Sequence, residues 1–335
     1  MSDPDFGPPT SPEATPSVNP EASSDPFGGG APVEPAGAPV PEPEPPGYLW
    51  HPREMPPPLE VVAPAPPAPP RLIPNLGHAV VFFLLLIPTI IVGWIATFLV
   101  LRLVFAHMPV RELIGLMTKN VSYMVGAQAV WYGLQWALAA LIFTLWWHRP
   151  FLEGVQWNAG RARRWFARLA LLGLLTGLAI TLAGNFVPMP KAPPILEDLT
   201  KSTAGAWMLM VFGITVAPLT EELAFRGFLL PGFINVFRWM ERRRMIGEGA
   251  VRSIGIPISI VLTTIPFALM HSAQVSNSWG PVLLIGMVSV ILCIVRLVTE
   301  SVACGVIVHA CYNFTLFAGL LYQTDWFRHL EKLKT

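Results

Sequence analysis

Seven long apolar segments constrain this chain more than any other feature. Each holds about 18 or more mostly apolar residues, the length that a helix needs to cross about 30 Å of hydrocarbon. Backbone groups inside a bilayer must be paired within the segment, so such segments form helices. The sequence therefore predicts an all-α, polytopic transmembrane helix bundle of about seven spans, at residues 78–105, 121–147, 166–187, 205–238, 254–271, 280–296 and 302–323.

The composition agrees with a bilayer around these segments. Of the 335 residues, 53% are hydrophobic and only 13% are charged, which leaves too little polar surface for a soluble globule of this size. The three cysteines, Cys293, Cys304 and Cys311, lie inside apolar segments and have no metal-finger spacing. We interpret them as packing residues, and we predict no disulfide framework.

Residues 1–75 differ sharply from the rest of the chain. They hold two thirds of the 36 prolines, together with ten acidic residues and only two basic ones, Arg53 and Arg71. A segment of this composition cannot bury enough apolar area to offset its chain entropy. We expect a disordered, acidic, proline-rich tail. It is either a docking arm for proline-recognising partners or, as we favour, a solubilising extension without a single partner.

Loop arginines predict how the spans are oriented. Cytoplasmic loops of membrane proteins carry an excess of positive charge. The link between the second and third spans carries Arg149, Arg161, Arg163 and Arg164, and the link between the fourth and fifth carries Arg238, Arg242, Arg243, Arg244 and Arg252. We therefore expect both links and the N-terminal tail to be cytoplasmic, in a multi-pass protein of a bacterial inner membrane. Arg111 and Lys119 would then lie outside, unless their segment lies along an interface.

Two local features predict how the spans bend and pack. Pro88 lacks a backbone N–H, so it should bend the first span. Gly173 and Gly177 in the third span have the GxxxG spacing that permits close contact between helices. We interpret this pair as a packing feature within the bundle.

Ionisable side chains inside the spans mark the candidate site. A charge at the bilayer centre costs about 2.5–3.5 kcal/mol even on lenient insertion scales, so each one requires a reason. The fourth span carries Glu221, Glu222 and Arg226 within six residues. His271 ends the fifth span, and His309 lies in the seventh.

Helical spacing separates the roles of the two glutamates. Glu222 and Arg226 are four residues apart and share a helix face, so they can form an ion pair that lowers the cost of keeping both in the membrane. Glu221 points about 100° away from Glu222 and is free to face another partner.

Depth along the helices brings residues from three spans to one level. A rise of about 1.5 Å per residue places Glu221, His271 and His309 about 20–28 Å from arginines on the same predicted side. Asn313 lies one turn after His309, and Phe267 lies one turn before His271. The sequence thus predicts one shared site.

Such a site could hydrolyse a peptide bond. Glu221 could take a proton from water as a general base. His271 and His309 could hydrogen-bond that water, or they could coordinate with Glu221 a divalent metal such as zinc that polarises it. Asn313 could stabilise the oxyanion that forms when a peptide carbonyl is attacked. The zinc motif HExxH is absent from the sequence.

Other readings of these residues are possible. Glu222 and Arg226 could be a purely structural ion pair, and Asn313 could only hold two helices together. Buried glutamates and histidines also serve as relays in ion-coupled transporters, although no inverted repeat is visible here. A catalytically silent scaffold or immunity protein is a third possibility, because function depends on geometry.

Three motifs in this order resemble a known family. EExxxR at Glu221–Arg226, FxxxH at Phe267–His271 and HxxxN at His309–Asn313 are similar to the motifs of the CAAX prenyl protease and bacteriocin-processing (Abi) family of intramembrane endopeptidases. The resemblance covers about residues 205–323. Each motif alone is weak, but the ordered set is quite specific.

The resemblance implies peptide-bond hydrolysis by a glutamate-activated water within the bilayer. It implies that Glu221 is the principal base, that Glu222 and Arg226 support it, and that His271, His309 and Asn313 complete the site. The family has been described both as metalloprotease-like and as metal-independent. Substrates would be prenylated CAAX-type proteins, bacteriocin leaders or other membrane peptides.

From these arguments we predict four parts of the chain. They are a tail at 1–75, N-terminal transmembrane helices at 76–200, a catalytic core at 201–323 and a short C-terminal tail at 324–335. The expected partners are the lipid bilayer and a membrane-associated peptide or protein substrate, and not nucleic acid.

Overall fold

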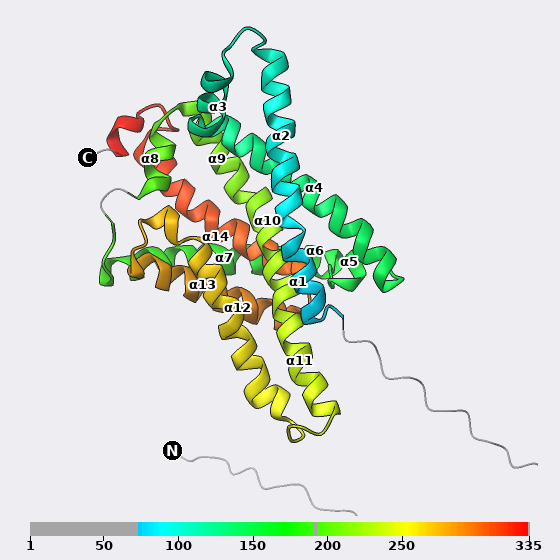
Figure 1. Ribbon diagram of the computed structural model, residues 1–335. Coiled ribbons are helices and arrows are strands. Elements are labelled where there is room, and N and C mark those ends of the chain that lie inside the picture. The colour runs from blue at the N-terminus through cyan, green and yellow to red at the C-terminus, as the bar shows by residue number, and fades with distance from the viewer. Residues whose placement is uncertain (1–72, 191–192, 334–335) are drawn as a thin grey trace, which may run out of the picture. The chain divides into compact units, whose positions relative to one another are not determined.

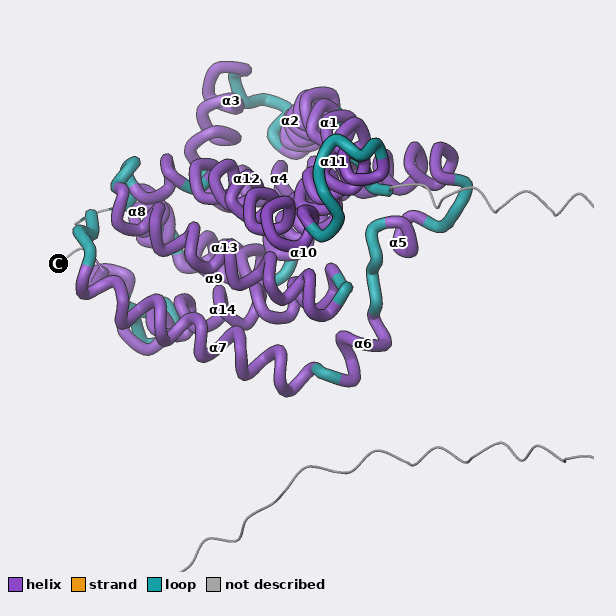
Figure 2. The backbone as a smooth tube through the Cα atoms, turned by 90° about the horizontal axis from the view of Figure 1, so that it is seen from below, coloured by secondary structure: helices purple, strands orange, loops and turns teal. Residues whose placement is uncertain are grey.

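The computed structural model describes residues 73–190 and 193–333, apart from the side chains of Ile195 and Leu196. The predicted tail at 1–75 lies almost wholly outside the described residues. Within the described ranges the chain is helical, with no strand. Its helices are α1 (Leu76–Leu84), α2 (Leu86–Val104), α3 (Val110–Lys119), α4 (Val121–Trp147), α5 (Phe151–Gly154), α6 (Ala159–Arg164), α7 (Phe166–Ala183), α8 (Pro194–Thr200), α9 (Thr203–Ile214), α10 (Val216–Glu222), α11 (Leu230–Arg242), α12 (Ile256–Met270), α13 (Trp279–Thr299) and α14 (Val302–Gln323) (Figures 1 and 2). Short π-helical turns η2 (Leu223–Leu229) and η3 (Val251–Gly255) precede α11 and α12, and the 3₁₀ turns are η1 (Gly184–Phe186), η4 (Ser272–Val275) and η5 (Leu330–Leu333).

Seven helical segments of the described chain are long and apolar enough to cross a membrane. Their bounds are Leu76–Val104, Val121–Trp147, Phe166–Phe186, Thr203–Arg242, Val251–Met270, Trp279–Thr299 and Val302–Gln323. Large apolar side chains along them face outward, as Leu103 does with 82% of its surface exposed. Because water would oppose such exposure, a bilayer must cover these faces. The prediction of an all-α bundle with seven spans is confirmed, and the chain is an integral, multi-pass membrane protein.

Prolines break two of these spans. The first divides at Leu85, three residues before Pro88, whose missing N–H leaves the carbonyl of Leu84 without its usual helical donor. The fourth span has 40 residues and divides at Thr215, three residues before Pro218. Figure 1 shows α9, α10 and α11 following one another in a single bent column.

The GxxxG pair packs α7 closely against α14. A Cβ atom on Gly173 would lie 2.4 Å from the carbonyl oxygen of Val308, and one on Gly177 would lie 2.5 Å from Cβ of Thr315. Both distances are too short for real carbon atoms, so only glycine permits this approach. Figures 1 and 2 both show α7 and α14 side by side. The interpretation of the pair as a packing feature is confirmed, and the packing fixes the helix that carries His309.

The segments that join or follow the spans are also ordered. Helix α3 carries Arg111 and Lys119, and it buries Leu113 and Met117 against Leu101 at the end of α2. After α14 the chain folds back, so that Phe327 is fully buried beside Trp207 of α9. The three cysteines are free, and Cys293 and Cys304 are buried.

Candidate active site

The fourth span carries a fully buried ion pair. Arg226 Nη1 donates to Glu222 Oε1 at 2.9 Å, and both side chains have no exposed surface. The pair joins positions four apart, as the spacing predicts, although it runs from the end of α10 into η2. Burying two charges costs several kcal/mol per ion unless further bonds compensate, so the surroundings of this pair matter.

Three further contacts surround the guanidinium group of Arg226. Its Nη2 donates to both the hydroxyl and the carbonyl oxygen of Ser289 in α13, at 2.8 and 3.0 Å. The ring of Phe267 in α12 lies 4.4 Å from the guanidinium carbon, which is the geometry of a cation–π contact. Phe267 is thereby part of the site, and the sequence analysis missed Ser289. The one sign of Ser289 in the sequence is a serine hydroxyl in the middle of the apolar span that forms α13.

A π-helical turn places Arg226 within the span. A π-helical turn is characterised by bonds from an N–H to the carbonyl five residues earlier, and at the end of η2 Leu230 N–H bonds in this way to the Phe225 carbonyl. The next donor in this series would be residue 231, which is a proline and has no N–H. The carbonyl of Arg226 instead accepts a hydrogen bond from Arg296 Nε of α13 at 3.1 Å. Arg296 also donates to Gln156, so the loop before α6 helps to hold the turn.

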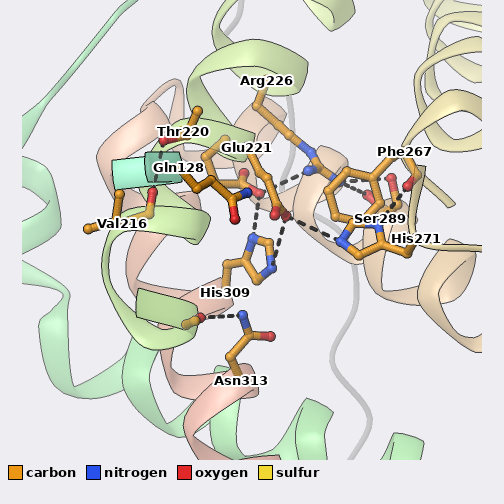
Figure 3. Close-up of polar contacts among 12 residues, drawn as sticks. Gln128, Val216, Thr220, Glu221, Arg226, Phe267, His271, Ser289, His309 and Asn313 are labelled. Atoms are coloured by element: carbon orange, nitrogen blue, oxygen red, sulfur yellow. Dashed lines mark hydrogen bonds and ion pairs between the residues drawn. The ribbon is translucent and has the colours of Figure 1, made fainter. Parts of the chain in front are cut away.

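Two histidines converge on Glu221. His271 Nε2 and His309 Nε2 each lie 3.7 Å from the same oxygen, Glu221 Oε2. The Glu221 and His271 side chains are 13% and 16% exposed, whereas His309 is nearly buried at 4%. The structure therefore brings the three residues together from three spans, at the common level that the helix rise predicts (Figure 3).

Hydrogen bonds define which ring nitrogen of each histidine carries the proton. His271 Nδ1 lies 2.8 Å from the carbonyl oxygen of Phe267, and His309 Nδ1 lies 3.1 Å from Glu222 Oε1. Both oxygens can only accept, so each Nδ1 must donate. In the neutral form of each ring, Nε2 is then left with a lone pair, and both Nε2 atoms face Glu221. Three acceptors facing one another need a donor or cation between them, such as a water molecule or a proton.

Glu222 thus connects the two halves of the site. Its Oε1 accepts from both Arg226 and His309. Its Oε2 is buried and has no hydrogen-bond partner among the described residues. That atom lies against Gly305, one turn before His309 on α14, where a Cβ atom would be only 2.6 Å away. A glycine at 305 is therefore required for α14 to approach the carboxylate, and sequence reasoning gave this residue no role.

Asn313 occupies a different place from the other motif residues. Its Nδ2 donates to the carbonyl oxygen of Gly213 at 2.7 Å. Gly213 lies in the last turn of α9, where carbonyl groups have no partner within the helix. In Figure 3, Asn313 lies beyond His309, on the side away from Arg226. The structure therefore gives Asn313 a bond between α14 and α9, and the proposed oxyanion contact stays a prediction.

A fourth side of the site comes from α4. Gln128 and Tyr132 lie one helical turn apart on this helix, and the Tyr132 hydroxyl accepts a hydrogen bond from Gln128 Nε2 at 2.9 Å. Figure 3 shows Gln128 pointing toward Glu221 and His309. Sequence reasoning missed both residues, because neither is charged and α4 carries no recognised motif.

A divalent metal was predicted at Glu221, His271 and His309. A carboxylate oxygen and two ring nitrogens are donors that zinc accepts. Over the described ranges, however, no group of three or more His, Cys, Asp or Glu side chains is arranged to hold a metal ion. The present arrangement thus does not fit a metal site, and the metal stays a prediction.

One comparison with known proteins matches the part of the chain that carries the site. A family model described as "Type II CAAX prenyl endopeptidase Rce1-like" matches residues 203–315, about a third of the chain. The match begins with α9, ends within α14 and includes every predicted site residue. No curated protein and no solved structure gives a significant match. The family resemblance drawn from the three motifs is confirmed for this part of the chain.

Proposed function

We propose that this membrane protein, whose residues 203–315 are similar to type II CAAX prenyl endopeptidases, is an intramembrane endopeptidase that uses a glutamate-activated water. One observation carries the proposal. Two histidine nitrogens from separate spans converge at 3.7 Å on one oxygen of Glu221, within the membrane-spanning bundle. A structural ion pair alone would not require this convergence, because Glu222 and Arg226 already pair with each other without Glu221.

The attacking water would bind between Glu221 and the two rings. A separation of 3.7 Å is too long for a direct hydrogen bond, but one water could contact all three atoms. Glu221 would take a proton from this water while its oxygen attacks the scissile carbonyl carbon. The C–N bond would then break, and the proton would pass to the departing amine.

The buried ion pair would hold this arrangement in place. Glu222 accepts from His309 Nδ1 and so orients the ring that faces Glu221. Arg226 in turn fixes Glu222 through contacts to α12 and α13. Such preorganisation contributes to catalysis, because the groups need not reorganise when the transition state forms. Glu222 and Arg226 are therefore proposed as positioning residues, and Glu221 as the base.

The proposed substrates are membrane-associated proteins or peptides, with prenylated CAAX-type proteins as the first class to test. This class follows from the family match alone. We also propose that the N-terminal tail is cytoplasmic, since the arginine-rich links before α7 and after α11 support that orientation.

Cleavage by protein reconstituted in liposomes tests the proposal. A prenylated CAAX peptide and an unprenylated peptide with a membrane anchor would be incubated with wild-type protein and with E221Q, and products would be identified by mass spectrometry. We expect a defined cleavage by the wild-type protein, and a loss of about 10²–10⁴-fold in rate in E221Q. Equal cleavage by both proteins would exclude Glu221 as the base.

Metal dependence needs a separate measurement. The metal content of purified protein would be determined before and after treatment with a chelator, and activity would be followed in parallel. Loss of activity that one divalent ion restores would support a metal at Glu221, His271 and His309. Full activity in metal-free protein would support direct activation of water by Glu221.

A further inference from the structure

The loop between α5 and α6 contacts two elements of the candidate site through one residue, Gln156. Its side-chain Oε1 accepts a hydrogen bond from Arg296 Nη2 of α13, and Arg296 Nε donates to the Arg226 carbonyl at 3.1 Å. Its backbone carbonyl oxygen accepts from the N–H of Val302 at 3.2 Å. Val302 begins α14, so its N–H has no partner within that helix. Gln156 thus joins η2, through Arg296, to the first turn of the helix that carries His309.

The backbone of Gln156 has a conformation that normally favours glycine. Gln156 directly follows the C-cap of α5, and its φ is +59°. Its N–H bonds to the Glu153 carbonyl at 3.0 Å, and the N–H of Trp157 bonds to the Leu152 carbonyl at 2.7 Å. These two bonds form the Schellman pattern, in which glycine is the usual residue because a side chain is strained there. The bond from Arg296 gives a physical reason for a glutamine at this position.

Arg296 is the second part of this link. Its side chain lies inside the bundle with only 5% of the residue exposed, so its charge requires hydrogen-bond acceptors. The Arg226 carbonyl is one acceptor, and it lacks a π-helical donor because Pro231 has no N–H. Gln156 supplies the other acceptor. A chain of two hydrogen bonds therefore runs from the loop to η2.

A second pair of bonds holds the same loop to the start of α14. Asn158 N–H donates to Ser301 Oγ at 3.3 Å, and the Ser301 hydroxyl donates to the Asn158 carbonyl at 3.2 Å. Ser301 is also the N-cap of α14, where its Oγ accepts from the N–H of Cys304. These bonds do not involve the Gln156 side chain. Removing that side chain would therefore release η2 from a loop that stays bound to α14.

The relative position of η2 and α14 determines the geometry of Glu222. One oxygen of Glu222 accepts from Arg226 of η2 at 2.9 Å and lies 3.1 Å from His309 Nδ1 of α14. Its other oxygen would lie 2.6 Å from a Cβ atom at Gly305 of α14. A shift of η2 along α14 must therefore change at least one of these contacts. His309 carries such a shift to the reacting centre, because its Nε2 faces Glu221.

We propose that Gln156 and Arg296 are positioning residues, which hold Glu222 against His309 by tying η2 to α14. The inference rests on the proposed function. Neither residue belongs to the three motifs, and Gln156 lies outside the segment that the family model matches. Both act through other residues and do not touch the substrate or the water in this proposal. Their loss should therefore lower kcat and leave KM nearly unchanged.

Cleavage kinetics of Q156A, Q156G and Q156E in liposomes would test the inference, with E153A as the control. Q156A and Q156G remove the acceptor for Arg296. We expect kcat to fall about 10-fold or more in both, because a misplacement of about 1 Å can cost about 10²-fold in rate. Q156E keeps an oxygen acceptor at the same reach and should recover kcat to within about threefold of the wild-type value. The exposed Glu153 side chain lies 3.9 Å from Arg149 alone among the printed ion pairs of this loop, so E153A should leave kcat unchanged.

Unfolding midpoints separate positioning from a general loss of stability. Glycine suits the positive φ at position 156 better than alanine does. Q156G should therefore unfold at a higher temperature than Q156A, although both variants lose the same factor in kcat. Activity that instead follows the midpoint would show a merely structural role and would overturn the inference. Wild-type kcat in both variants, or a change in KM alone, would overturn it as well.

A double-mutant cycle tests whether the two residues act through one chain of bonds. If they do, Q156A/R296M should lose no more kcat than R296M alone, whereas losses that multiply would refute the link. If R296M does not fold, the three Gln156 variants decide by the criteria above. Loss of cleavage in E221Q together with full activity in Q156A and Q156G would refute this inference alone. Full activity in E221Q would refute the proposed function.

Discussion

Gly305 gives the sharpest prediction about the geometry of the site. Its helix, α14, lies so close to Glu222 that a Cβ atom at 305 would be 2.6 Å from Oε2, and ordinary contact begins at 3.4 Å. In G305A the carboxylate and α14 must therefore separate by about 0.8 Å. Glu222 cannot simply rotate away, because its other oxygen is bonded to Arg226 and His309.

The cost of that displacement can be estimated in two ways. Forcing an extra methyl group into a packed interior costs about 1–3 kcal/mol. A misplacement of about 1 Å in a reacting group can cost about 10²-fold in rate. We therefore expect G305A to lose about 1–3 kcal/mol of stability and about 10–100-fold in kcat/KM, with the Glu221 side chain itself unchanged.

Gly319 provides the matched control. It lies on the same helix, and a Cβ atom there would meet nothing within 4 Å. Replacing glycine by alanine inside a helix is otherwise stabilising by about 0.5–1 kcal/mol, so G319A should have an equal or higher unfolding midpoint and unchanged activity. Thermal unfolding in detergent and peptide cleavage in liposomes would be measured for both variants. Equal behaviour of G305A and G319A would refute the close approach of α14 to Glu222.

Three further substitutions test the surroundings of the site. R226M leaves the buried Glu222 carboxylate without its arginine partner and should cost about 3–5 kcal/mol, whereas E222M/R226M should recover much of the stability without activity. An R226M protein as stable as wild type would contradict the pairing. S289A removes one acceptor of a charged hydrogen bond and should cost about 1.5–3 kcal/mol in thermal unfolding, and no change would show that the Ser289 carbonyl suffices. G173A should separate α7 from α14 and lower the stability by about 1–3 kcal/mol. The control G126A should not lower the stability, because a Cβ atom at Gly126 would meet nothing within 4 Å. Equal unfolding midpoints of the two variants would argue against the GxxxG contact.

Sequence reasoning predicted the features that depend on local order along the chain. The spans follow from hydropathy, because the bilayer fixes the length of each helix. The Glu222–Arg226 pair follows from its four-residue spacing. The common depth of Glu221, His271 and His309 in the membrane follows from the rise per residue along each helix. These arguments need no knowledge of which helices are neighbours.

Features that depend on the neighbours of each helix could not be predicted in this way. Ser289 and Gly305 reach the ion pair only because α13 and α14 pack against η2. Gln128 and Tyr132 are common neutral residues, and the position of their helix in the bundle depends on α4 packing against α9. The spacing of Asn313 from His309 predicted a contact with the reacting groups, yet its amide donates to the Gly213 carbonyl at the end of α9.

The break in the fourth span was also beyond the sequence argument. A continuous helix was expected from 205 to 238, whereas the chain divides at Thr215 and passes through a π-helical turn after Glu222. Pro218 lies just after the break at Thr215, and Pro231 lies just after the π-helical turn. Each proline removes one backbone N–H donor from the helix. The hydropathy pattern cannot show which carbonyl is left free or that Arg296 will bind it.

Single-turnover cleavage by E221Q tests the central claim most directly. Wild-type protein and E221Q, each shown by thermal unfolding to be folded, would be mixed in excess with a membrane-anchored peptide that the wild-type protein cleaves, and the cleavage rate would be followed by mass spectrometry. If Glu221 is the base that activates water, the rate in E221Q falls by about 10²–10⁴-fold while the peptide still binds. A folded E221Q protein that cleaves the same bond at the wild-type rate would contradict the account.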